Sequence, residues 1–207
     1  MRSLYALPLL IVVAALATGC GLSHDMSSMG DHDMNSMDDP AGGMTSMHSA
    51  EAMGTGRSAD VMFSQQMIPH HQQAVAMSEL ALDPARGASP AVQSLARGIK
   101  AGQAQEITLM AGWLQQWDAS PAGEADHEME GGMGLLSKQQ LDALSKANGE
   151  AFDALWLAGM IGHHEGALLM ASHIRGATTN AAVSGLADAI TTSQTRELAE
   201  MRAMLAG

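Results

Sequence analysis

The sequence predicts an all-α domain, a four-helix bundle made of two copies of one helical hairpin. From about residue 58 onward, apolar residues recur with the 3.6-residue period of helices, and no run alternates convincingly as in a strand. The motif Met-x-x-His-His-x-x-Ala-x-x-Met occurs twice, starting at Met67 and at Met160. The residues downstream of each copy also match, so the repeated unit is a whole hairpin, and two hairpins can pack as a bundle.

The first 20 residues have the features of an export signal. An apolar run over residues 4–16 follows Arg2 and is too short to span a bilayer as a mature helix. The segment LATGC at residues 16–20 resembles the lipobox of bacterial lipoproteins, and Cys20 is the only cysteine. We therefore expect a lipoprotein signal peptide over residues 1–20, with lipidation of Cys20 anchoring the protein to the extracytoplasmic face of the cell membrane. An ordinary signal peptide with an incidental Cys20 is the alternative.

Residues 21–57 form a low-complexity segment rich in methionine, histidine and acidic residues. Residues 24–53 hold seven Met, three His and six Asp or Glu, without an apolar period. We expect this segment to be a disordered tether. Thioethers suit Cu(I), while imidazoles and carboxylates suit Cu(II) and other divalent ions, so the tether is also a candidate metal collector. A tether without ligand function is the alternative.

The folded domain is expected over residues 58–207. Ser58 can cap the first helix, and Ser89 followed by proline can start the second. Ser137 opens a short helix with a capping box, and Asn180 can cap the last helix. The expected long helices cover residues 58–82, 90–117, 150–175 and 180–207, with a loop at 118–134.

The helical period places one histidine of each motif on the inward face. His70 and His163 fall on apolar stripes, whereas His71 and His164 lie about 100° away, at the edge of that face. The second and fourth helices carry polar residues at matching heights within their own apolar stripes. These polar positions are Gln103, Glu106, Gln194 and Glu197.

Three interpretations of this polar level remain open. The first is purely structural, with His–Glu hydrogen bonds and packed methionines. The second is a soft metal site for copper. The third is a hard, carboxylate-rich site of the ferritin type, although the Glu-x-x-His pattern of such sites is missing. The candidate metal ligands are His70, His71, Met67, Met77, His163, His164, Met160, Met170, Glu106 and Glu197.

The paired motif resembles the signature of the domain of unknown function 305 (DUF305) family. Its two copies read MIPHHQQA at residues 67–74 and MIGHHEGA at residues 160–167. The resemblance covers about residues 58–206 and implies a ferritin-like four-helix fold in an exported bacterial protein. It also implies copper, because some members are periplasmic copper-binding or copper-tolerance proteins with Met/His-rich tails. The matching residues locate the site at both His pairs and at the methionines that flank them.

Charge and motifs restrict the function further. The formal net charge of −12 at pH 7 disfavours nucleic acid as a partner and favours metal ions. The sequence has no Ser-His-Asp set, phosphate loop or nucleotide fingerprint, so we do not expect an enzyme. The leading hypothesis is copper capture, buffering or tolerance. A structural or interaction module and a metal-dependent redox enzyme are the alternatives, and a homo-oligomer stays open.

Overall fold

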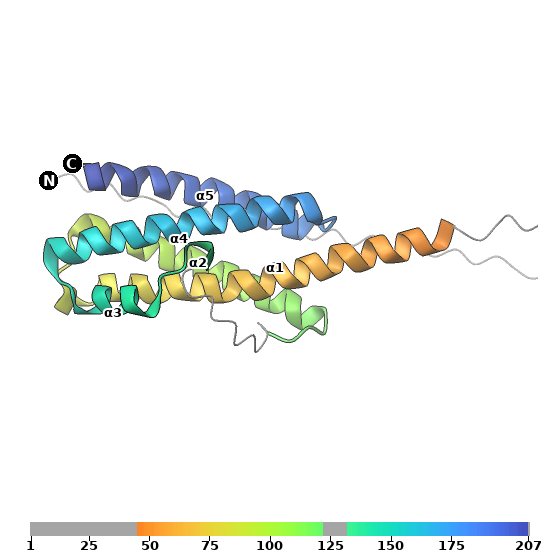
Figure 1. Cartoon of the computed structure of the whole chain (residues 1–207), viewed down its shortest axis with the longest axis horizontal. Coiled ribbons are helices and arrows are strands. Elements are labelled where there is room, and N and C mark those ends of the chain that lie inside the picture. Colours follow the sequence, from red (N-terminus) through yellow and green to blue (C-terminus); the bar gives the residue numbers. More distant parts are fainter. Residues whose placement is uncertain (1–44, 122–131, 207) are drawn as a thin grey trace, which may run out of the picture. The chain divides into compact units, whose positions relative to one another are not determined.

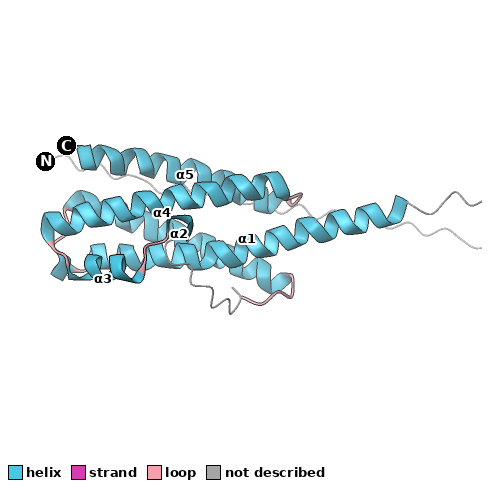
Figure 2. Cartoon of the chain, viewed as in Figure 1, coloured by secondary structure: helices cyan, strands magenta, loops and turns pink. Residues whose placement is uncertain are grey.

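The described part of the chain is all-α, as the sequence predicts. The structure is a computed structural model and describes residues 45–121 and 132–206, which contain helices and loops but no strand (Figure 2). The elements are α1 (Thr45–Leu82), η1 (Pro84–Arg86), α2 (Pro90–Gln116), η2 (Gly132–Gly134), α3 (Lys138–Lys146), α4 (Gly149–Ala177) and α5 (Ala181–Ala206).

The predicted helix starts of α2, α3 and α5 are confirmed by their local hydrogen bonds. The Ser89 hydroxyl accepts from the backbone N–H of Val92, and Pro90 occupies the first turn of α2. Ser137 and Gln140 form the expected capping box of α3. The side chain of Asn180 accepts from the second residue of α5. Local sequence therefore fixes where these three helices begin.

Two helix boundaries differ from the prediction. α1 begins at Thr45 rather than near Ser58, so residues 45–57 are helical although the sequence predicts a disordered tether there. This stretch has no proline, and the backbone of Gly56 lies against Thr179, where an added Cβ would come within 3.2 Å of the hydroxyl. α4 continues to Ala177, one residue past the glycine expected to end it. Both helices pass through glycines, which weaken a helix by about 1 kcal/mol each but, unlike proline, keep the backbone N–H that the helix needs.

The helices pair as two hairpins. α1 packs against α2 and α4 packs against α5, while contacts between α1 and α4 join the hairpins (Figure 1). The short helix α3 lies between the hairpins in the sequence and contacts α4. The predicted inward face is confirmed, because both copies of the motif supply buried residues to the contact between α1 and α4. This contact therefore brings the two histidine motifs together.

Two hydrophobic clusters make up the core. One cluster includes Met77, Met160 and Trp156, and the other includes Met67 and Met170. Phenylalanine and tryptophan are few in this chain, so aliphatic residues and methionines fill most of the volume. Within residues 45–121 and 132–206, no helix is long and apolar enough to cross a membrane. Cys20 and its predicted lipobox lie outside the described residues.

Candidate metal centre

The imidazoles of His70 and His163 lie against each other between α1 and α4. Their ring centroids are 3.7 Å apart and their planes are tilted by 37°. Both residues are buried, with 1% and 0% of their surface exposed. Each histidine comes from the inward face of its helix, as the helical period predicts. The two motifs therefore meet at their first histidines.

Backbone carbonyls fix the tautomer of both rings. The Nε2 of His163 donates to the carbonyl oxygen of His70 at 2.7 Å, and the Nε2 of His70 donates to that of Met133 at 3.0 Å. Because a carbonyl oxygen only accepts, each Nε2 carries the hydrogen. The Nδ1 atom of each neutral ring is then left with a free lone pair. Neither Nδ1 has a hydrogen-bond partner within the described residues, and both atoms are buried.

Burial keeps this histidine pair neutral. Desolvation lowers the pKa of His70 from 6.5 to about 4, with smaller contributions from the neighbouring histidines. Desolvation, followed by the proximity of His70, lowers the pKa of His163 well below its usual value. Both rings are therefore uncharged at neutral pH. An uncharged imidazole with an unprotonated nitrogen is the form of histidine that binds metal ions.

The second histidine of each motif pairs with a glutamate of its own hairpin. The Nε2 of His71 donates to Glu106 at 2.7 Å, and the Nε2 of His164 donates to Glu197 at the same distance. The sequence places these two histidines at the edge of the inward face, but both are completely buried. They are buried because they face α2 and α5, which cover that edge. The predicted convergence of His and Glu is thus confirmed within each hairpin.

Two buried glutamines add further unpaired polar atoms. Gln103 lies one turn before Glu106 on α2, and Gln194 lies one turn before Glu197 on α5. Both side chains are almost fully buried, and their nitrogen and oxygen atoms have no partner in the part of the chain that the structure describes. Burying a polar group without a partner costs about 1–3 kcal/mol. A ligand or bound water that satisfied these atoms would recover that cost.

The predicted methionine ligands lie in the two hydrophobic clusters. Met67 and Met170 share one cluster, and Met77 and Met160 share the other. All four are buried and therefore serve core packing. Each cluster contains the first methionine of one motif and the last methionine of the other, as expected when the motifs on α1 and α4 run antiparallel. Thioethers are thus present in the core on both hairpins that supply the histidines.

A loop segment that the sequence did not single out closes the histidine pair. Met133 has a left-handed backbone, with φ 58°, and its carbonyl accepts the hydrogen bond from His70. This carbonyl lies so close to Gly166 of α4 that a Cβ there would be 1.6 Å from the oxygen. Gly134, also left-handed, would clash with the carbonyl of Gly162 if it carried a side chain. The glycines around Met133 predict a loop, but nothing in the sequence predicts that this loop contacts the histidine pair.

The same loop is held on the side of α1 by a glutamine. The side-chain amide of Gln73 donates to the carbonyl of Leu136 at 3.0 Å and accepts from its N–H at 2.8 Å. Gln73 and Gly166 occupy equivalent places in the two motifs. The first motif therefore binds the loop through the side chain of Gln73. The second motif has Gly166 at that position, and the missing side chain leaves room for the loop. This difference makes the two halves of the site unequal.

The donor set restricts what kind of metal site is possible. Among residues 56–121 and 132–206, no group of three or more His, Cys, Asp or Glu side chains is placed to hold a metal ion. Within that part of the chain, a third side-chain donor beside His70 and His163 would be a thioether, an amide or a hydroxyl. The combination of two imidazoles with a thioether suits a soft cation better than a hard one.

The fold is an all-α domain of two hairpins that meet at a buried histidine pair. The chain belongs to the DUF305 family (domain of unknown function), which matches residues 60–205. This confirms the resemblance that the two motifs indicated.

Solved structures of similar proteins include two from this family. A DUF305 protein from Streptomyces coelicolor is 30% identical, with a TM-score of 0.66, over 72% of this chain and 91% of that chain. A DUF305 fragment from Deinococcus radiodurans is also 30% identical, with a TM-score of 0.66, over 72% and 95%. CopM in its Cu(II)-bound form is 35% identical, with a TM-score of 0.62, over 70% and 94%. No curated protein sequence matches the chain significantly.

Proposed function

We propose that this protein binds copper outside the cytoplasm and serves in its capture, buffering or tolerance. The observation that carries this proposal is the contact of His70 with His163. Two neutral, buried imidazoles lie 3.7 Å apart between their centroids, and each has an Nδ1 atom without a partner among the described residues. Leaving such atoms unsatisfied is costly unless a ligand uses them.

The chemistry of the surrounding donors favours copper over a hard cation. Imidazole nitrogens and thioethers are preferred ligands of Cu(I), which needs few donors. His70 and His163 would supply the nitrogens, and the core methionines supply soft donors on the same two helices. Glu106 and Glu197 already accept hydrogen bonds from His71 and His164. We therefore assign these glutamates the role of orienting the second histidines.

The similarity to CopM supports the same proposal. CopM has been solved in Cu(I)-bound, Cu(II)-bound, silver-bound and apo forms. Its Cu(I)-bound form is 34% identical to this chain, with a TM-score of 0.59, over 70% of this chain. Copper and silver share a preference for soft ligands in their monovalent states. The similarity to CopM and the buried histidine pair therefore both support copper as the bound metal.

The wider architecture belongs to the proposal as well. We propose that the two hairpins form a ferritin-like four-helix bundle that arose by duplication, with residues 58–207 as the folded domain. Residues 1–20 would act as a lipoprotein signal peptide, and Cys20 would anchor the mature protein to the membrane. Residues 21–57, helical from Thr45 onward, would link the anchor to this domain and collect metal through their methionines and histidines.

A structural module is the second candidate, and the two His–Glu pairs favour it. Each pair is short, and the histidine of each is completely buried, so the pairs stabilise their hairpins whether or not a metal binds. The packed methionines also stabilise the core whether or not a metal binds. This candidate predicts no metal affinity at the core, whereas copper binding requires it.

The test is the affinity of the full chain for Cu(I), measured by competition with a chromophoric chelator. The double variant His70→Ala/His163→Ala should lose at least one Cu(I) equivalent, while Met204→Leu, on α5, should lose none. Circular dichroism checks that both variants keep their helices. Equal stoichiometry and affinity in the wild type and the histidine variant would refute the proposed site.

A further inference from the structure

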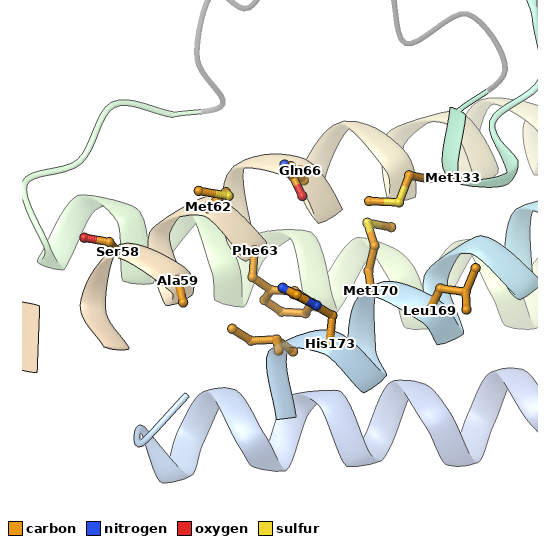
Figure 3. Close-up of a pocket in the computed structure, with 10 residues that line it drawn as sticks. Ser58, Ala59, Met62, Phe63, Gln66, Met133, Leu169, Met170 and His173 are labelled. Atoms are coloured by element: carbon orange, nitrogen blue, oxygen red, sulfur yellow. The ribbon is translucent and has the colours of Figure 1, made fainter. Parts of the chain in front are cut away.

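A pocket opens beside the histidine pair, between α1 and α4. Its volume is about 1120 Å³, and residues of α1 and α4 line it together with Met133 of η2 (Figure 3). None of the residues that line it within the described chain is acidic. This is notable in a protein with a formal charge of −12. The described lining of the pocket therefore offers no carboxylate to a hard divalent cation.

The donors that the pocket does offer are soft. Three methionines and one histidine line it, namely Met62, Met133, Met170 and His173. In Figure 3 the side chains of Met133 and Met170 point toward one another across the pocket. Methionine side chains are flexible and polarisable, so they can close on an ion without movement of the backbone. Thioethers with imidazole form a ligand set for monovalent d¹⁰ cations.

The three methionines of the pocket differ in their exposure to solvent. Met62 is 56% exposed, Met133 is 38% exposed and Met170 is 5% exposed. Met133 also touches the histidine pair, because its carbonyl accepts the hydrogen bond from His70 at 3.0 Å. Met170 lies two turns after His163 on the same face of α4. Met133, through its carbonyl, and Met170, through its helix, thus connect the lining of the pocket to the histidine pair.

We propose that Met62, Met133, Met170 and His173 form a second site for a soft monovalent cation, the solvent-accessible neighbour of the buried histidine pair. The proposal rests on the proposed copper function and adds the place where Cu(I) or Ag(I) first binds the helical domain. His173 has no equivalent in the first motif, where Leu80 stands, so the duplication does not create a second copy of this ligand set. The pocket residues come from α1, η2 and α4, and the site requires all three elements.

Silver titration of the full chain, labelled with ¹³C at the methionine methyl groups, tests this site residue by residue. Single Met→Leu variants assign the resonances of Met62, Met133 and Met170. We expect Ag(I) to shift these three methyl signals, and the variant Met62→Leu/Met133→Leu to weaken Ag(I) binding at Met170 at least tenfold. The matched control is Met204→Leu on α5, outside this pocket, which should leave the titration unchanged.

The readout separates this site from the histidine pair. Unshifted methyl signals of Met133 and Met170 at saturating Ag(I), together with a response of the His70 and His163 imidazoles, would overturn the second site alone. No response at either place would overturn both proposals. Shifts of Met62 and Met133 that persist in His163→Ala would show that the pocket binds the cation by itself, as proposed.

Discussion

The side chain of His163 donates a hydrogen bond to the backbone carbonyl of His70 at 2.7 Å, so each motif contacts the other at its first histidine. The bond crosses from α4 to α1 and fixes which nitrogen of His163 carries the hydrogen. Burial keeps both rings neutral, and two imidazolium charges with ring centroids 3.7 Å apart would also repel each other.

The neutrality of this pair makes the stability of the metal-free protein depend on pH. The folded pKa of His70, about 4, lies below its unfolded value of 6.5, so the unfolded chain binds the proton first as the pH falls. The contribution of neutral His70 to the free energy of unfolding is complete above pH 6.5 and is lost as the pH falls toward 4. We expect His70 alone to reduce the free energy of unfolding by roughly 3 kcal/mol across this window, since one pKa unit corresponds to about 1.4 kcal/mol.

Urea unfolding at pH 7.5, 6.0 and 4.5 measures this dependence. The free energy of unfolding should change less with pH in His70→Ala and in His163→Ala than in the wild type. A stability that does not change between pH 7.5 and 4.5 would contradict the neutral pair.

The His–Glu pairs should contribute to stability more than the surface ion pairs do. Glu106→Ala or Glu197→Ala leaves the Nε2–H of a completely buried histidine unsatisfied, which should cost about 1–3 kcal/mol. The control is Glu165→Ala, which removes an ion pair with Arg202 whose side chains are 51% and 58% exposed. That change should cost less than about 1 kcal/mol. Equal losses in urea unfolding would show that the buried pairs have no special role.

Two glycines of α4 should respond in opposite directions to the same substitution. Gly166→Ala places a methyl group 1.6 Å from the carbonyl oxygen of Met133, so the loop must move, and we expect a loss of about 1–3 kcal/mol. Gly162→Ala meets no atom within 4 Å and should gain about 0.5–1 kcal/mol from helix propensity. Thermal unfolding of both variants checks this. A stable Gly166→Ala protein with an unchanged His70 resonance would show that the loop does not hold His70.

Local sequence patterns predicted most of the helical domain. Serine and asparagine caps predicted the starts of α2, α3 and α5, and the 3.6-residue period placed His70 and His163 inward. These features depend on residues within one or two turns of each other, so a sequence contains them. The pairing of His with Glu followed from polar positions on apolar faces.

Contacts between distant segments could not be predicted from the sequence. The carbonyl of Met133 binds His70 across 63 residues, and its close approach to Gly166 depends on a left-handed backbone. Main-chain groups leave no pattern in side-chain chemistry, so neither contact was predictable. The contact of Gly56 with Thr179 is likewise a contact between segments far apart in the chain. The pocket was missed because Met62 and His173 lie off the inward faces.

The central claim is that the Nδ1 atoms of His70 and His163 bind the cation. Long-range ¹H–¹⁵N spectra of the imidazoles, recorded with and without Ag(I), test it directly. Without metal, both rings should show a protonated Nε2 and an unprotonated Nδ1 at pH 7. Ag(I) should shift the two Nδ1 signals and leave each Nε2 protonated. Unchanged Nδ1 signals at saturating Ag(I), or rings protonated at Nδ1 in the metal-free protein, would contradict the account.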